Sequence, residues 1–525
     1  MSRLCIILAV GAFLGLFITS CTKNKIEAEK QRYVLKVQIS TDPVTMDPSL
    51  IEDGVSMEII HNVMDGLFGH DAQGKRINQL AESWTVSKDG RRYEFALRHD
   101  ARWSDDIPVR ATDFVTAFRR ALSPKVPAKL APLLFSIRGA KAFHAGTASE
   151  LAGVYEKDGK LVIELEEPTS YFLEVLTLAN TLPLRQDILT DNGGNWPITA
   201  PATGPYRIAA YQPGRRFLLD KNDAYYGKKP TMYLIDVLII QDDSTAVNLF
   251  EKGDLDILTR VPGTELPRLE AKGLIQREPF LATYYLGFNT RKAPANDLSF
   301  RRAVSGAIRR DEIVQALASG EVPARSWIPP GLEGSIPYQD PAPVFADSVK
   351  AFREKFARQG AGFPPVTAGF DSSPRNTMVM EKVESDLKNN LGIRVLLSNM
   401  DWKSFIGSLQ SDPPTIYRMG WLAPFGDPIP HLEVFISHGL NNYTGWSSAE
   451  YDRLVAEIAR LAPGPEREQK IRQAEKLLVD DQAVVVPIYH YVQQHAIAAR
   501  LANVHANPFG VIPFNEVTLK DAHAH

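Results

Sequence analysis

Apolar and polar positions alternate, or recur at helical spacing, over most of the chain. Apolar residues at every second position follow the turn Lys88-Asp89-Gly90, which predicts a hairpin strand around residue 95. The same period on both sides of Pro213-Gly214 predicts a second hairpin. Between them, an apolar face that follows Thr112 as N-cap and ends before Pro124 predicts a helix. This mixture indicates α/β or α+β domains.

The second half of the chain is richer in helical patterns. Residues 447–450, Ser-Ser-Ala-Glu, have the form of a capping box before an apolar face, and Pro465 predicts the start of the next helix. Residues 484–488 read as a short strand. Because Pro487 has no backbone N–H, we expect this residue either in an edge strand or at the end of its strand.

The N-terminus has the order of a secretory signal. Arg3 is followed by an apolar stretch over residues 4–18 and then by small residues up to Cys21. Fifteen helical residues span only ~22 Å, short of the ~30 Å hydrocarbon core, so the stretch is a poor permanent anchor. The sequence resembles a bacterial lipoprotein lipobox, which implies cleavage after residue 20 and acylation of Cys21. A plain secreted protein with a cysteine at this position is the alternative.

Composition fits an exported, water-soluble body. The 525 residues suggest roughly three domains, and the formal net charge of -3 gives no basis for binding nucleic acid. Cys5 leaves with the signal, so the body behind Cys21 has no disulfide and depends on its 44% apolar residues for stability. Residues 21–32 are polar and charged, which predicts a tether between lipid and fold.

Catalytic motifs are missing from the sequence. It contains no G-x-S-x-G, H-E-x-x-H, C-x-x-C or glycine-rich phosphate loop, and its 11 histidines are scattered. We therefore expect a binding protein without cofactor or metal, and no enzyme.

Five separated stretches together resemble the extracytoplasmic solute-binding proteins of peptide ABC importers, family 5, which are oligopeptide-binding lipoproteins. Each stretch is weak alone, but their order spans nearly all of residues 35–520. They are residues 42–48 (DPVTMDP) with 64–67 (MDGL), 80–84 (LAESW) with 95–98 (FALR), 202–206 (ATGPY) with 222–226 (NDAYY), 284–290 (YYLGFNT), and 420–428 (GWLAPFGDP) with 487–489 (PIY).

The resemblance implies a fold class and a domain layout. The fold is α/β, a two-lobed clamshell of the type II periplasmic-binding-protein kind with an extra domain on the first lobe. By position, a signal peptide would occupy residues 1–20, lobe I residues 33–64, 190–284 and 500–525, the extra domain residues 65–189, and lobe II residues 285–499.

The resemblance also implies a function. A lipid-anchored, monomeric receptor in the periplasm or at the cell surface would capture peptides between its lobes and deliver them to ABC permease subunits in the membrane. The lobes would pair with the peptide backbone as added strands, and roomy pockets would tolerate varied side chains.

Several positions match ligand contacts of the family. Glu52 and Gly54 match the lobe I segment that meets the peptide backbone. Trp402, Trp421 and Phe280 match aromatic cleft residues, although a tryptophan is often simply part of a core. Arg418 matches an arginine that meets a short ligand's carboxylate, and an internal ion pair is its alternative role.

Two departures from the family pattern matter. Where relatives carry an aspartate for the ligand's ammonium, this chain has Pro424. Either Asp427 takes over that role, or the ligand presents no free amino terminus: a modified or blocked peptide, a cell-wall fragment or an oligosaccharide. A surface lipoprotein or enzyme that reuses the scaffold is a further alternative. The positions of a disulfide found in some relatives are Ala282 and Leu422, which leaves no stray thiol.

Overall fold

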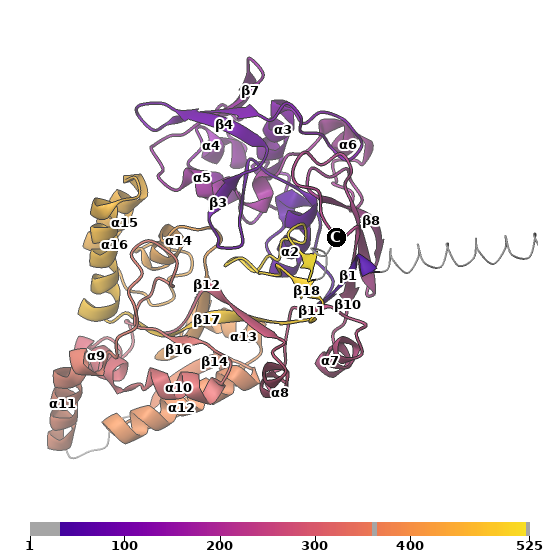
Figure 1. Ribbon diagram of the computed structural model, residues 1–525. Helices are drawn as coiled ribbons and strands as arrows, with labels where there is room; N and C mark the ends of the chain where they lie inside the picture. Colours follow the sequence, from indigo (N-terminus) through magenta and orange to yellow (C-terminus); the bar gives the residue numbers. More distant parts are fainter. Residues whose placement is uncertain (1–31, 360–364, 521–525) are drawn as a thin grey trace, which may run out of the picture.

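The computed structural model describes residues 32–359 and 365–520 and has a mixed α/β architecture. Figure 1 shows a helix-rich part at the lower left, a second part at the right, and a further unit above them built from the indigo and magenta segments. The predicted signal, Cys21 and the predicted tether up to residue 31 fall outside the described residues.

One large mixed sheet runs through both lobes. Its strand order is β15-β14-β16-β12-β17-β11-β1-β10-β9-β8, with the short β13 on β17. The two longest strands, β12 (Ile275–Phe288) and β17 (Val485–Ile497), lie side by side in its centre and are antiparallel. The sheet is therefore continuous from one lobe to the other only through this central pair.

The ladder between β12 and β17 is interrupted where the chain passes between lobes. Pairing stops after Pro279 and resumes at Thr283, so that residues 280–282 lie opposite Tyr491 alone. Such a bulge bends the strand that carries the extra residues. On one side of it β17 pairs with β11, and on the other β12 pairs with β16. The predicted lobe boundaries at 284/285 and 499/500 fall within and just after these strands.

Lobe I contains strands and helices from both ends of the chain. Its core is formed by parallel β1 and β10, whose apolar residues Leu35, Val37 and Ile235 are fully buried. Its elements are β1 (Val34–Ile39), η1 (Pro48–Leu50), α2 (Gly54–Val63), β8 (Tyr206–Gln212), β9 (Arg216–Lys221), β10 (Leu234–Ile239), α7 (Asp243–Glu251), β11 (Ile257–Leu258), α8 (Leu266–Ala271), β18 (Leu501–Ala502) and β19 (Thr518–Leu519).

A separate four-stranded sheet, in the order β4-β5-β7-β6, forms within residues 65–189, the range expected for the extra domain. Helix α3 packs on it with Phe114 and Phe118, which are fully buried. The elements of this unit are β2 (Phe68–His70), β3 (Arg76–Asn78), β4 (Ala81–Val86), β5 (Arg92–Leu97), α3 (Ala111–Ala121), η2 (Ala131–Leu134), α4 (Ala140–His144), β6 (Val154–Lys157), β7 (Lys160–Glu164), α5 (Phe172–Val175), η3 (Ala179–Thr181) and α6 (Gln186–Asp191).

Lobe II has helices on both faces of its part of the sheet. Alternate residues of β12 enter different cores: Tyr284 packs with α9 and α12, and Tyr285 packs with α13, α15 and α16. Its remaining elements are α9 (Leu298–Ala307), α10 (Arg310–Leu317), β13 (Val322–Pro323), α11 (Ala342–Gln359), β14 (Val366–Asp371), α12 (Pro374–Leu391), β15 (Val395–Met400), α13 (Trp402–Ser411), β16 (Ile416–Leu422), α14 (Ile429–Leu432), η4 (Glu433–Phe435), α15 (Ala449–Arg460), α16 (Pro465–Lys476) and η5 (Leu477–Asp481).

Two local predictions are wrong. The strand expected to be short over residues 484–488 is 13 residues long and lies inside the sheet, not at its edge, whereas Pro487 does lie near the start of the strand. Pro487 is tolerated there because it lies at a register shift and because the strands on the other side of β17 pair only further along. The N-cap of α3 is Arg110, with Asp113 accepting from the backbone N–H of Arg110, so the helix starts before Thr112.

Candidate functional site

Four of the residues predicted for ligand binding meet on one surface beside β12 and β17, the two strands that run between the lobes and are called the crossing strands below. They are Phe280, Trp402, Arg418 and Trp421. Together with four neighbours they line a cavity of about 260 Å³. We call this surface the aromatic wall; it consists of Phe280, Ala282, Trp402, Arg418, Gly420, Trp421, Leu422 and Tyr491.

Adjacent strands bring these residues together. In the antiparallel ladder of β12 and β16, Ala282 lies opposite Leu422 and Thr283 lies opposite Trp421. The two positions expected to match a disulfide in some relatives are thus direct neighbours. Tyr491 comes from β17, at the bulge. A side chain at Gly420 would come within 3.0 Å of the Tyr491 hydroxyl, so a glycine keeps room for that ring.

The two tryptophans of the wall differ in exposure. Trp402 opens α13 directly after its N-cap, Asp401, and is 55% exposed, which is unusual for so large an apolar side chain. Trp421 packs partly against the core, and its Nε1 is buried without a hydrogen-bond partner among the described residues. A buried donor without a partner is unfavourable, so an acceptor brought by a ligand or water would stabilise this arrangement.

Strand β16 has a free edge beside the wall. On one side β16 pairs with β12 from Ile416 to Leu422. On the other side, the recorded pairing with β14 covers only Ile416 and Tyr417. Within the described ranges, the backbone from Met419 to Leu422 therefore has no strand partner on that side. Such an edge offers N–H and C=O groups to an extended chain.

Arg418 lines the cavity and also forms an internal ion pair, which was the alternative role considered for it. Its Nη1 is 2.5 Å from Asp371 Oδ1, and its Nη2 donates to the Tyr491 hydroxyl at 3.3 Å. Its guanidinium stands 4.9 Å from the centre of the Tyr284 ring. Burial alone would lower the pKa of Arg418, but Tyr491, Tyr284 and Asp371 together raise it above its ordinary value.

Asp427 lies apart from the aromatic wall. Both of its carboxylate oxygens accept from Nη2 of Arg467, at 2.7 and 2.8 Å, and Oδ1 also accepts from the backbone of Ile429. Arg467 is almost completely buried and has a second carboxylate partner, Glu333. Burial raises the pKa of Asp427, while Arg467 opposes the rise. These contacts favour a structural role for Asp427 over contact with a ligand.

Glu52 and Gly54 lie on lobe I, at the start of α2. Glu52 Oε1 is 2.5 Å from Nζ of Lys129, an exposed lysine of the extra domain. Gly54 is the first residue of α2 and has open space where a side chain would be. Neither residue lines the aromatic wall or the larger cavity described next.

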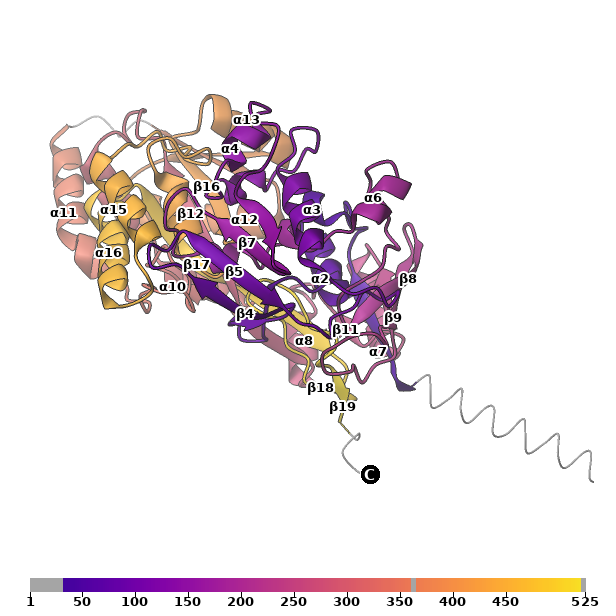
Figure 2. The ribbon, with the colours of Figure 1, turned by 90° about the horizontal axis from the view of Figure 1, so that it is seen from above.

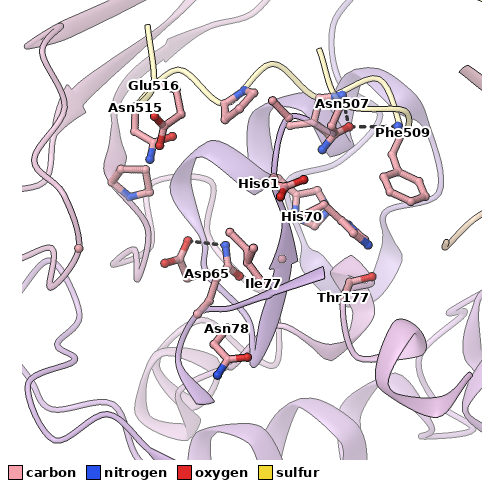
Figure 3. A pocket seen from close by; sticks show the side chains of 18 of the residues that line it. His61, Asp65, His70, Ile77, Asn78, Thr177, Asn507, Phe509, Asn515 and Glu516 are labelled. Atoms are coloured by element: carbon pink, nitrogen blue, oxygen red, sulfur yellow. Dashed lines mark hydrogen bonds between the residues drawn. The ribbon is translucent and has the colours of Figure 1, made fainter. Parts of the chain in front are cut away.

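A second cavity of about 620 Å³ lies between lobe I and the extra domain (Figure 3). It is lined by His61 of α2, by Asp65 just after that helix and by His70 and Asn78 of the β2–β3 hairpin. Residues from 503 to 516 line its remaining side. Among the described residues of lobe II, Pro424 alone lines it. In Figure 2, the C-terminal strands β18 and β19 that flank residues 503–516 lie on the opposite side of the molecule from α13.

Polar side chains that line this cavity form hydrogen bonds with one another. Asp65 accepts from the Tyr226 hydroxyl at 2.6 Å and from Gln79 at 3.1 Å. Burial raises the pKa of Asp65 to about 6, and burial together with His70 lowers that of His61 to about 4. No local sequence pattern indicates this cavity, because its walls come from segments hundreds of residues apart.

The described residues contain no group of three or more His, Cys, Asp or Glu side chains arranged to hold a metal ion. Among these residues, no helix combines the length and apolar character needed to cross a membrane.

Comparison with known proteins identifies the family. The model of bacterial extracellular solute-binding proteins, family 5, matches residues 75–443, more than half of the chain. The chain belongs to this family. The two-lobed fold is also confirmed. The unliganded open form of the periplasmic murein tripeptide-binding protein MppA superimposes with a TM-score of 0.80 at 26% identity, covering 93% of this chain and 97% of that one.

Two relatives show how far the sequence similarity extends. The oligopeptide-binding protein OppA of Bacillus subtilis is 30% identical over 482 residues, 88% of each chain. A probable deoxycholate-binding periplasmic protein of Escherichia coli, YgiS, is 28% identical over 478 residues, 87% of this chain and 88% of its own. Membership of the family is therefore compatible with ligands of different chemistry.

Proposed function

We propose that this protein is the solute-binding component of an ABC importer, which captures peptides between its lobes and delivers them to a membrane permease. The free edge of β16 next to the aromatic wall carries the proposal. An extended peptide could add to this edge through main-chain hydrogen bonds, which do not read its sequence. Phe280, Trp402 and Trp421 would then take its apolar side chains.

The crossing strands supply the movement that such a receptor needs. Lobe II is joined to lobe I through β12 and β17. The pairing of these two strands is interrupted at residues 280–282 of β12, opposite Tyr491 of β17. A ligand that touches both lobes favours the closed state, and this difference in affinity is the signal a permease could read. Glu52 and Gly54 are the lobe I residues that we expect to meet the ligand from the other side.

Direct titration tests the proposal. The protein is titrated calorimetrically with tri-, tetra- and pentapeptides, and the bound ligand is then recovered for mass spectrometry. We expect saturable binding of several unrelated sequences and recovery of intact peptide. Absence of binding would contradict peptide capture, and cleaved peptide would contradict a pure binding role.

A second candidate is a ligand without a free amino terminus, such as a blocked peptide or a cell-wall fragment. It is favoured because no carboxylate lines the aromatic wall and because Asp427 is bound to Arg467. A buried ammonium without a counter-charge is unfavourable. N-acetylated peptides that bind more tightly than the free ones would favour this candidate.

We also propose that Cys21 carries the lipid that holds the receptor at the membrane. The support is the order of charged, apolar and small residues before it. Replacing Cys21 by serine is expected to move the protein from the membrane to the soluble fraction. Unchanged membrane association would contradict lipid anchoring.

A further inference from the structure

Arg418 is the only charged side chain of the aromatic wall, and its guanidinium already contacts protein partners through both Nη atoms, while its Nε is buried without a hydrogen-bond partner among the described residues. Asp371 forms its ion pair at 2.5 Å, Tyr491 accepts a hydrogen bond, and the Tyr284 ring lies against its guanidinium. The side chains of Arg418 and Asp371 are only 12% and 18% exposed. Water therefore screens this pair weakly.

The ion pair stands at the point where the sheet opens. The parallel pairing of β14 and β16 ends at Gly369 and Tyr417. Asp371 is the last residue of β14 and Arg418 directly follows Tyr417 in β16, so the pair lies where the free edge of β16 begins. A chain added to that edge must run past both charges.

The pair has no net charge, and this decides which ligand groups suit the position. A ligand carboxylate that approaches Arg418 also approaches Asp371, and like charges at short range repel. Because Asp371 already neutralises Arg418, the carboxylate would gain little net attraction in return. A neutral apolar group meets no such repulsion and can pack on Phe280, Trp402 and Trp421.

We propose that Asp371 is a specificity-determining residue of this site: by neutralising Arg418 it makes the wall select peptides with a neutral, apolar group at this position and reject acidic ones. The inference rests on the proposed peptide-binding function. In this proposal Asp371 controls the net charge that the ligand meets, and it need not touch the ligand to do so.

The test is a calorimetric scan of the full chain near neutral pH. Tetra-alanine is compared with tetrapeptides in which each alanine in turn is replaced by leucine or by glutamate. At one position or more, glutamate is expected to bind at least about tenfold more weakly than leucine. In Asp371→Asn, Arg418 loses its counter-charge, and the penalty at that same position is expected to shrink by at least about tenfold.

Two further variants separate the charge from a general disturbance of the fold. Asp371→Glu keeps the carboxylate and is expected to restore the penalty. Asp187→Asn removes the exposed carboxylate that pairs with the largely buried Arg185 in the extra domain and is expected to leave the penalty unchanged. If Asp371→Asn fails to fold, Asp371→Glu and the wild-type scan still test the inference, since a wild type without a glutamate penalty overturns it.

The possible outcomes are distinct. Peptides that bind wild type equally well with glutamate or leucine at every position overturn the inference and leave the proposed function intact. A penalty that persists unchanged in folded Asp371→Asn also overturns it. Failure of every peptide to bind wild type overturns the proposed function, and this inference with it.

Discussion

Trp402 is the proposed binding residue whose replacement should affect ligand binding far more than fold stability. More than half of its side chain is exposed, so Trp402→Ala removes little buried area. We expect peptide affinity to fall by about tenfold or more while stability changes by less than about 0.5 kcal/mol. Titration calorimetry and thermal melting measure the two effects.

A matched control is available for this substitution. Tyr233 is another exposed aromatic residue, 36% exposed, but it lies in lobe I outside both cavities. Tyr233→Ala is expected to leave affinity unchanged. Equal affinities for wild type and Trp402→Ala would remove Trp402 from the site.

Asp427 is expected to behave in the opposite way. Asp427→Asn leaves Arg467 buried with Glu333 as its remaining partner, so we expect a loss of stability of roughly 3 kcal/mol. Affinities for free and N-acetylated peptides are expected to change alike. A selective loss for peptides with a free amino terminus would instead identify Asp427 as the partner of the ligand's ammonium.

Glu58 should make stability depend on pH. It is buried in α2, its Oε1 has no partner among the described residues, and burial raises its pKa from 4.5 to about 8. The unfolded chain loses this proton from about pH 4.5, but the native state keeps it until about pH 8. Its contribution is therefore fully present below about pH 4.5 and is lost as the pH rises to about 8.

Denaturant unfolding at pH 5 and pH 8 measures this effect. Since Glu58→Gln cannot ionise, we expect it to gain stability relative to wild type between these two pH values, by a few kcal/mol at most. A stability difference between the two proteins that is independent of pH would show that Glu58 ionises normally in the native state.

At the scale of elements, the hairpins could be predicted because their signals are local. The turns at Gly90 and Gly214 both have positive φ and join β4 to β5 and β8 to β9, as their two-residue apolar period indicates. Pro465 likewise opens α16, and Ser448 caps α15.

Long-range pairing could not be predicted in the same way. The length of β17 depends on its ladder with β12, some 200 residues earlier in the chain. Pro487 led to the prediction of a short strand at this place. The ion pair of Arg418 and Asp371 joins residues 47 positions apart, and no sequence spacing indicates it. The family resemblance predicted the aromatic residues of the wall. The free strand edge and the larger cavity could be found only in the three-dimensional structure.

The register of β12 and β16 can be tested with a disulfide. Since Ala282 and Leu422 are directly opposite, Ala282→Cys with Leu422→Cys is expected to form a bridge under oxidising conditions. Peptide mapping without reduction should detect the cross-link. Ala282→Cys with Met419→Cys is the control, because Met419 pairs with Tyr285. A cross-link in the control but not in the first pair would contradict this register.

At the scale of the molecule, the lobes touch beyond the crossing strands. Tyr171 of the extra domain stacks on Phe425 of lobe II with ring centres 5.5 Å apart. The backbone of Ser170 donates to Ala459, and Arg460 pairs with Glu167. The extra domain thus supports lobe II at one end, and we expect closure to turn about this contact and the bulge in β12.

Small-angle X-ray scattering with and without a saturating tetrapeptide tests the central claim most directly. A receptor that closes on its cargo becomes more compact, so we predict a smaller radius of gyration with peptide bound. Identical scattering curves, at a peptide concentration where calorimetry shows the site to be full, would contradict capture by closure of the two lobes.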